Sequence, residues 1–412
     1  MTGIAARPLA RLFGDRRSRI YLGGQIASIF GDTALFLSTA VWVRELTGSD
    51  GAAAATFLFL TAPALASPFV GVLVDRVRRR PLLIIVNAMT GAVVLLLLLV
   101  RDAGDVRLVY AVMTLYGAAS TIISSAQSAL LPAIVPEELL GDANGLLQTV
   151  QQGARVLSPV VGVGLFTAFG GGVVAVVDAV SFAVAVVTLM VIRVDEPTPS
   201  PRDRTVSVRA DIGAGFAHVR TDPALRVIVV VCAGVWGALG LSESVVFAVV
   251  SQGLGLEPSF LGATSSLQGA GALVGGVLSA RLIRWRGELR VAGGASAALA
   301  AGFLLWMLPD APAVLLGSLV LGAALPPLVV GCATLIQRRS PDRLRGRVHS
   351  AFDMALTVPQ TAAIAVGASL VAHVPYRALL IVMCVVLVGA AAALLRAGPR
   401  GDAGPLGHDP AG

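Results

Sequence analysis

Four ionisable side chains stand inside apolar stretches that are long enough to be membrane spans. They are Asp32, Arg155, Asp178 and Glu243. A charge at the centre of a bilayer costs on the order of 2.5–3.5 kcal/mol on insertion scales, so each of them requires a reason. Arg155 stays charged at any ordinary pH, and it therefore needs an acidic partner or an anionic group of a bound molecule. These residues predict a site for proton coupling and ion pairing. The alternative is a static pair that only holds helices together.

Polar residues that share a helical face with these charges indicate an internal cavity. Asp32 stands 13 residues after Arg19 and 12 before Arg44, near the middle of its stretch. Helical spacing places Gln25, Ser28 and Asp32 on one face, which we expect to turn away from lipid. The full set of candidate cavity residues is Gln25, Phe36, Asn144, Gln148, Gln152, Trp236, Gln268 and Gln360.

The composition predicts that membrane-spanning helices position these residues. Of 412 residues 56% are hydrophobic and 13% charged, with a mean hydropathy of +0.83, which is typical of a polytopic membrane protein. Because a span needs about 20 apolar residues, we expect an all-α protein with twelve transmembrane helices. The apolar runs lie at 20–44, 51–74, 82–100, 108–131, 141–169, 171–192, 224–250, 258–283, 289–308, 311–337, 348–372 and 374–396.

The arginines predict how these helices are oriented. All 31 basic residues are arginine; 26 fall in segments on the side of the N-terminus and only four on the other side. By the positive-inside rule both termini are cytoplasmic. We therefore attribute the net charge of +7 to membrane orientation and expect no nucleic-acid partner. The three cysteines and four histidines are scattered, so no metal site, disulfide or cofactor is predicted.

The same pattern divides the chain into two halves. We predict a cytoplasmic tail at 1–19, a six-helix bundle at 20–192, a linker with an amphipathic helix at 193–223, a second six-helix bundle at 224–396 and a disordered tail at 397–412. Two loops recur at one offset of 205 residues. GVLVDRVRR at 71–79 returns as GVLSARLIR at 276–284, and the PEELLG that begins at Pro136 returns as the PDRLRG that begins at Pro341. A shared offset indicates a duplicated chain with a path between the halves.

The basic segment GVLVDRVRRRP at 71–81 resembles the signature loop between helices 2 and 3 of the major facilitator superfamily of secondary transporters. Arg78 stands where that family usually has a second glycine. The resemblance implies a cytoplasmic gate in which Asp75 meets the start of helix 11; the alternative is an anchor for membrane orientation alone. The gate residues expected on this basis are Gly71, Asp75, Arg76, Arg79, Arg80 and Asp353.

The fifth predicted helix resembles the antiporter signature of drug exporters. Its residues Gly145, Ser158, Pro159 and Gly162 keep the spacing of that motif, although three of its glycines are replaced by Ala, Ser and Val. Wider stretches, from GDTALFLSTAVWVRELTGS to LIQRRSPDRLRGRVHSAFDMALTVPQ, are similar to the macrolide-efflux and enterobactin-exporter-like branch.

The resemblance implies a monomeric transporter of the inner membrane that exports an amphipathic small molecule by alternating access, driven by protons. Asp32 or Glu243 is then the residue that takes up the proton. An uptake permease of the same fold is the first alternative. A polytopic membrane enzyme is the second, and it would need a catalytic or metal-binding cluster that the sequence does not show.

Overall fold

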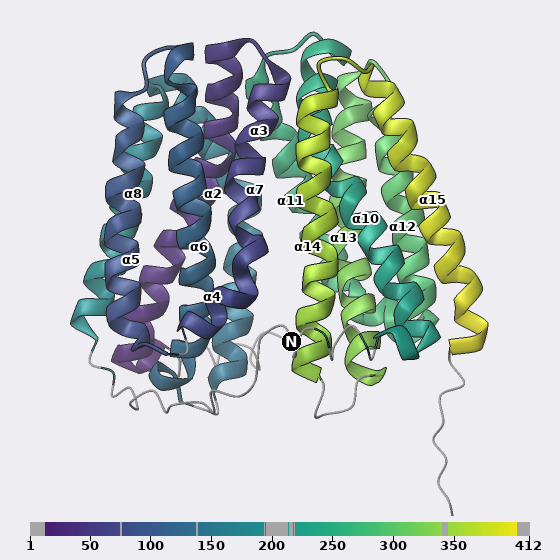
Figure 1. Cartoon of the computed structure of the whole chain (residues 1–412), viewed down its shortest axis with the longest axis horizontal. Coiled ribbons are helices and arrows are strands. Elements are labelled where there is room, and N and C mark those ends of the chain that lie inside the picture. Colours follow the sequence, from purple (N-terminus) through teal and green to yellow (C-terminus); the bar gives the residue numbers. More distant parts are fainter. Residues whose placement is uncertain are drawn as a thin grey trace, which may run out of the picture.

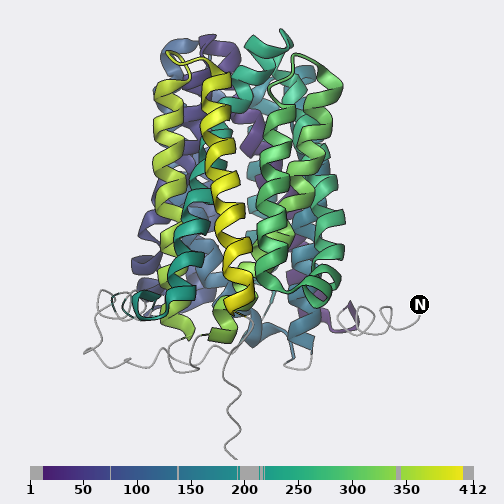
Figure 2. The same cartoon turned by 90° about the vertical axis from the view of Figure 1, so that its right-hand side faces the viewer.

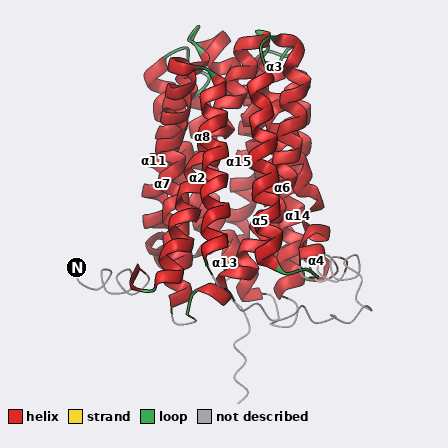
Figure 3. Cartoon of the chain, turned by 90° about the vertical axis from the view of Figure 1, so that its left-hand side faces the viewer, coloured by secondary structure: helices red, strands yellow, loops and turns green. Residues whose placement is uncertain are grey.

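The computed structural model describes residues 13–74, 76–136, 139–192, 194, 213, 217, 219–339 and 345–401. Within these ranges every regular element is a helix and no strand occurs (Figure 3). This confirms the predicted all-α class. The predicted amphipathic helix of the linker falls almost entirely outside the described residues, as does the C-terminal tail beyond Gly401. Residues 397–401, predicted as part of a disordered tail, instead continue the last helix.

The helices follow the predicted apolar runs to within a few residues. In the first half they are α2 (Arg16–Thr47), α3 (Asp50–Thr61), η1 (Ala62–Ala66), α4 (Ser67–Val74), α5 (Arg79–Val94), η2 (Leu95–Leu99), η3 (Ala103–Asp105), α6 (Val106–Ile134), α7 (Leu140–Phe169) and α8 (Gly171–Val191). In the second half they are α10 (Pro223–Ala248), η5 (Val249–Gly253), η6 (Pro258–Phe260), α11 (Leu261–Arg286), α12 (Glu288–Leu305), α13 (Ala311–Arg339), α14 (Arg345–Leu370) and α15 (Tyr376–Gly401).

Nine helices of the described chain are long and apolar enough to cross a membrane. Three further helical stretches, namely α7, α11 and the broken run α3–η1–α4, occupy the places expected for the remaining spans. The polytopic membrane fold is therefore present, and the full count of twelve spans remains a prediction.

The helices form two groups that stand side by side, α2 to α8 and α10 to α15 (Figure 1). Seen along the other axis, the helices of both groups run roughly parallel to one common direction (Figure 2). One buried hydrophobic cluster lies wholly in the second half, from Val219 to Leu394. A second cluster fills the first half but also takes in Phe247, Val250, Leu261 and Ile364 from the other.

Helix starts in the two halves keep the offset of 205 residues seen in the loops. It separates the first residues of α6 and α13, of α7 and α14, and of α8 and α15. Gly117 on α6 and Gly322 on α13 are also 205 positions apart. A Cβ atom on Gly117 would lie 1.9 Å from the carbonyl oxygen of Leu60, and one on Gly322 would lie 1.8 Å from that of Gln268. Matched glycines thus permit matched close approaches of α6 to α3 and of α13 to α11, as an internal duplication would produce.

The two halves meet toward one end of the helices. We call the end that carries the turn between α2 and α3 the Asp50 end, and the opposite end, which carries the turn between α4 and α5, the Arg80 end. Near the Asp50 end, a Cβ atom on Gly51 would lie 2.6 Å from the carbonyl oxygen of Ala368 on α14. The rings of Phe57 on α3 and Phe247 on α10 lie 5.9 Å apart. Tight packing therefore joins the halves at the Asp50 end.

Candidate functional site

Asp32 lies at the middle of α2, where its carboxylate is held by a tyrosine of another helix. Tyr116 Oη on α6 donates a 2.6 Å hydrogen bond to Asp32 Oδ1. Gln25 and Ser28, on the same face of α2, are buried, and Asp32 is partly exposed. Sequence reasoning missed Tyr116. The available signal was a tyrosine in an apolar helix, because its hydroxyl must find a partner when it is buried.

Asp178 lies on α8 and is completely buried. Neither of its carboxylate oxygens has a hydrogen-bond partner among the described residues. Its side chain lies against α2, since a Cβ atom on Gly31 would be 2.9 Å from Asp178 Oδ1. Asp32 and Asp178 interact electrostatically with each other and with Tyr116. The first half therefore contains two neighbouring carboxyl groups in its interior.

Small residues bring α2 and α8 together along much of their length. A Cβ atom on Gly24 would lie 2.5 Å from Thr188 Oγ1, and one on Gly171 would lie 2.2 Å from the indole ring of Trp42. Such small residues allow helix backbones to approach closely in a membrane. This packing positions Asp178 beside Asp32.

The side chains of several predicted site residues fall outside the described part of the structure, although their backbone belongs to α7. They are Asn144, Gly145, Gln148, Gln152, Arg155, Ser158 and Pro159. The predicted partner of Arg155 therefore remains a prediction. Gly162 of the same motif is described: a Cβ atom there would lie 2.5 Å from the carbonyl oxygen of Ala34. It lets α7 pack against α2 directly.

The other cavity candidates are distributed over both halves. Phe36 on α2 packs against Phe57, with ring centroids 4.7 Å apart. Trp236, Glu243, Gln268 and Gln360 are each partly buried in the second half. Phe36 therefore connects with the aromatic contact that joins the halves.

The predicted gate residues lie at the Arg80 end, except for Asp75, which is outside the described residues. Gly71 is partly buried, and Arg76 and Asp353 are exposed. Arg79 is partly buried at the start of α5. Arg80 Nε donates a 2.8 Å hydrogen bond to the carbonyl oxygen of Leu189, and Arg80 Nη2 donates one of 3.1 Å to that of Met190. Arg80 thus caps the last turn of α8, where a cation is favoured by the helix dipole.

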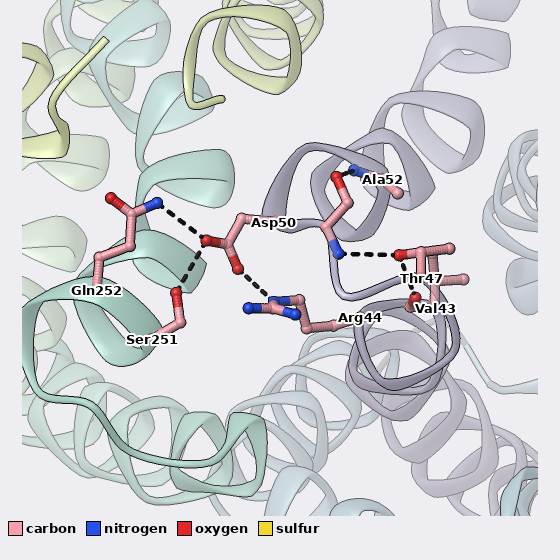
Figure 4. A network of polar contacts seen from close by, with 8 residues as sticks. Val43, Arg44, Thr47, Asp50, Ala52, Ser251 and Gln252 are labelled. Atoms are coloured by element: carbon pink, nitrogen blue, oxygen red, sulfur yellow. Dashed lines mark hydrogen bonds and ion pairs between the residues drawn. The ribbon is translucent and has the colours of Figure 1, made fainter. Parts of the chain in front are cut away.

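A polar network centred on Asp50 links the two halves (Figure 4). We call Arg44, Asp50, Ser251 and Gln252 the Asp50 network. Arg44 Nε donates to Asp50 Oδ1 in an ion pair. Ser251 Oγ and Gln252 Nε2, which both belong to η5 of the second half, donate hydrogen bonds of 2.8 Å and 3.2 Å to Asp50 Oδ2. Both oxygens of the buried carboxylate are therefore occupied, one by each half of the chain.

Local sequence explains how Asp50 is placed. Gly48 ends α2 with a φ of 68°, a conformation that glycine adopts without strain. Ser49 then caps α3 by accepting a 3.2 Å hydrogen bond from the backbone N–H of Ala52. Asp50 follows in the first turn of α3, where the helix dipole favours an anion. Sequence reasoning used Arg44 to orient the chain and to place Asp32 in its span. Nothing in the sequence links Asp50 to Ser251 and Gln252, which are 201 and 202 positions away.

The described residues contain no group of three or more His, Cys, Asp or Glu side chains that could hold a metal ion. What the site offers chemically is a carboxylate that joins two halves, and a separate pair of buried carboxyl groups within one half. The first arrangement joins the halves by hydrogen bonds, and the second places two acidic groups where a positive charge would be favoured.

Comparison with known proteins identifies the family of this chain. The family model described as Major Facilitator Superfamily matches residues 21–364 and 244–411. Macrolide efflux protein A of Streptococcus pyogenes is 25% identical over 216 residues, which cover 50% of this chain and 52% of that protein. The chain thus spans about half the length of this curated relative. An uncharacterized MFS-type transporter of Mycobacterium tuberculosis is 28% identical over 384 residues, covering 84% of this chain and 83% of that protein.

Solved structures with the same fold include a bacterial homologue of the iron transporter ferroportin in its inward-facing state. It has a TM-score of 0.72 at 17% identity and covers 92% of this chain and 98% of its own. The nucleoside transporter NupG has a TM-score of 0.73 at 10% identity and covers 93% and 99%. At these identities the likeness concerns the fold.

Proposed function

The chain belongs to the Major Facilitator Superfamily, and on that premise we propose that it is a proton-coupled exporter of an amphipathic small molecule that works by alternating access. Membership of this family makes it a multi-pass membrane transporter and not an enzyme. Bacterial relatives are consistent with a place in the inner membrane. The cargo, the direction and the coupling ion belong to the proposal.

The observation that carries the proposal is the Asp50 network. Alternating access requires contacts between the halves that close one end of the pathway and that break when this end opens. Ser251 and Gln252 donate to a carboxylate of the other half at the Asp50 end, and the packing of Gly51 and Phe57 against the second half lies at the same end. These contacts have the form expected of a gate in its closed state.

The strength of this gate is compatible with switching. A hydrogen bond to a charged group contributes about 1.5–3 kcal/mol, so the two bonds from Ser251 and Gln252 contribute roughly 3–6 kcal/mol to the closed state. A transporter that cycles needs its two states within a few kcal/mol of each other. Differential binding of cargo and coupling ion can supply a shift of this size.

The orientation follows from the arginines. Among the described residues, the arginines at 78–80 and at 284 and 286 lie toward the Arg80 end, and by the positive-inside rule we place that end in the cytoplasm. The Asp50 end then faces outward, and a contact that closes it corresponds to an inward-facing transporter.

The proposed coupling uses the charges inside the membrane. A proton taken up by Asp32 or Glu243 would change a pair with Arg155 and so bias the equilibrium between the inward-facing and outward-facing states. Tyr116 positions Asp32 for this role through its 2.6 Å hydrogen bond. Phe36 and Trp236 would give apolar contacts to the cargo. We expect the transporter to act as a monomer.

Export is the direction that the relatives favour. Macrolide efflux protein A, named for what it removes, resembles half of this chain. Gly162 of the antiporter-like motif lets α7 pack directly on α2, the helix that carries Asp32. No described feature favours the uptake permease of the same fold.

Transport in membrane vesicles tests the proposal. Everted vesicles that contain the protein and have an acidified lumen are expected to accumulate a radiolabelled macrolide as protons leave the lumen. The protonophore-treated vesicles and vesicles with Asp32→Asn should not accumulate it. Accumulation that does not depend on the proton gradient would exclude proton coupling. Accumulation of the macrolide by whole cells would show that the protein imports its cargo.

A further inference from the structure

Three buried oxygen atoms at the interface of α2 and α8 have no hydrogen-bond partner among the described residues. They are Oδ1 and Oδ2 of Asp178 and Oγ of Ser181. Asp178 is 0% exposed and Ser181 7% exposed. Buried polar groups are almost always hydrogen-bonded in native proteins, and each one left unpaired costs about 1–3 kcal/mol, more if it is charged. Three such atoms close together indicate a place for a missing positive ligand.

Two of these oxygens lie against one point of α2. A Cβ atom on Gly31 would lie 2.4 Å from Ser181 Oγ and 2.9 Å from Asp178 Oδ1. Residues 178 and 181 are three positions apart and therefore lie on one face of α8. Any side chain at position 31 would overlap Ser181. Glycine at this position lets α8 bring Asp178 and Ser181 directly against α2.

Asp32 is the next residue of α2 and adds a second carboxylate. Its Oδ1 is taken by Tyr116, while its charge interacts with that of Asp178. Two neighbouring carboxylates inside a protein are costly when both are ionised and nothing lies between them. The cluster thus combines a formal charge of −2 with hydroxyl and carboxylate oxygens, and it contains no sulfur or imidazole nitrogen.

We propose that Asp32, Asp178 and Ser181 bind a single hard divalent cation between α2 and α8. Carboxylate and hydroxyl oxygens are the ligands that suit Mg²⁺, Ca²⁺ and Mn²⁺, whereas thiolates and imidazoles select softer metals. A charge of +2 balances both carboxylates, and water completes the coordination shell, as is usual for such ions. The proposal goes beyond the proposed function, because binding requires neither the cargo nor a direction of transport.

The site belongs to the first half alone, since α2 and α8 both lie in it. A bound cation would therefore hold these two helices together without bridging the contact at the Asp50 end. It would raise the stability of the first half in proportion to its occupancy.

Titration of the purified full-length protein in detergent with MnCl₂ tests the proposal, with calorimetry and the electron paramagnetic resonance signal of free Mn²⁺ as the readouts. We expect one Mn²⁺ per chain and an upward shift of the thermal midpoint. We expect Asp178→Asn to weaken binding at least about 100-fold and Ser181→Ala about 10-fold. Asp310→Asn removes an exposed acid at a helix end and should bind as the wild type does. NaCl at matched ionic strength controls for screening.

Two results would overturn the proposal: no saturable binding of Mn²⁺ by the wild type, or unchanged binding in both site variants. If Asp178→Asn does not fold, Ser181→Ala decides alone, because loss of one hydroxyl is mild. The transport assay above is separate. Mn²⁺ binding without export would support this site and contradict the proposed function. Export without Mn²⁺ binding would support the proposed function and contradict this site.

Discussion

Ser251 Oγ donates a 2.8 Å hydrogen bond to Asp50 Oδ2 and so joins residues that are 201 positions apart in the chain. The acceptor is buried at the start of α3, and the donor lies in the short π-helical turn that follows α10. The other oxygen of Asp50 is paired with Arg44 of its own half. One carboxylate therefore takes part both in the turn between α2 and α3 and in the contact between the halves.

Removing the Ser251 hydroxyl should open the Asp50 end. Ser251→Ala loses a hydrogen bond to a charged group, which contributes about 1.5–3 kcal/mol to the closed state. The ratio of molecules open at this end to molecules closed there should therefore rise about 10-fold or more. Spin labels attached to Arg101→Cys and Asp310→Cys, both exposed at the Asp50 end, would show a longer distance population. Ser369→Ala is the matched control, because that exposed hydroxyl bonds only within α14. Equal distance distributions in both variants would exclude a gate role for Ser251.

The ion pair between Arg44 and Asp50 should also stabilise the closed state in which Ser251 bonds to Asp50. Asp50→Asn removes the charge but keeps the size of the side chain, and we expect a larger open fraction than in Ser251→Ala. A double-mutant cycle with Arg44→Gln measures the coupling, which should be between about 0.5 and 3 kcal/mol for residues in one network. Additive effects would mean that the two side chains act independently.

A clash with the main chain should make Gly117→Ala strongly destabilising. The new Cβ atom would lie 1.9 Å from the carbonyl oxygen of Leu60, and a backbone atom cannot rotate away. Overpacking of this kind costs about 1–3 kcal/mol or more, and Gly322→Ala should behave alike. Gly276→Ala is the control, since nothing lies within 4 Å of its Cβ position. Thermal midpoints in detergent that match between Gly117→Ala and Gly276→Ala would contradict the close packing of α3 on α6.

The first turn of α2 should depend on pH through Asp15, which lies outside the span. The side-chain and backbone hydrogen bonds from Ser18 lower the pKa of Asp15 below its ordinary value of 3.8. A lowered folded-state pKa means that the cap stabilises at pH values above 3.8 and that this contribution is lost as the pH falls through the lower, folded-state pKa. Hydrogen exchange of the amides of residues 16–20, corrected for its intrinsic pH dependence, should be faster in Asp15→Ala at pH 7. The difference should vanish toward pH 2–3. A difference that persists there would show that the carboxylate is not the cap.

The gate that the sequence predicts at the other end also has a test. Asp75→Asn should reduce transport severely while leaving membrane insertion intact, because the family resemblance gives this acid a role in closing the Arg80 end. Normal flux in the variant would leave the basic segment with its alternative role as an anchor for orientation.

The family was predicted from the resemblance of short segments such as 71–81. Hydropathy predicted the helical class and the helix positions, because each span must be apolar over a fixed length. The same reasoning singled out Asp32 and Asp178 as costly charges. It proposed Arg155 for their partner, and that pair stays a prediction. Tyr116, the residue that holds Asp32, depends on how α6 packs on α2, which no local pattern encodes.

The contact between halves was beyond sequence reasoning for the same physical reason. Ser251 and Gln252 are ordinary polar residues at the end of a span. Their role in binding Asp50 becomes visible only when η5 is placed beside α3. Arg80 shows the converse: it belongs to a recognisable motif, yet its described hydrogen bonds cap α8 within the same half. A motif predicts where a residue lies more reliably than what it contacts.

The central claim is that the Asp50 end must open and close during transport. Asp50→Cys combined with Ser251→Cys, joined by a reducible bifunctional thiol reagent in a background without Cys232, Cys332 and Cys384, tests it directly in everted vesicles. The account predicts that cross-linking abolishes accumulation of the macrolide and that a reductant restores it to the level of the same double variant before treatment. Undiminished transport by the cross-linked protein would contradict the account.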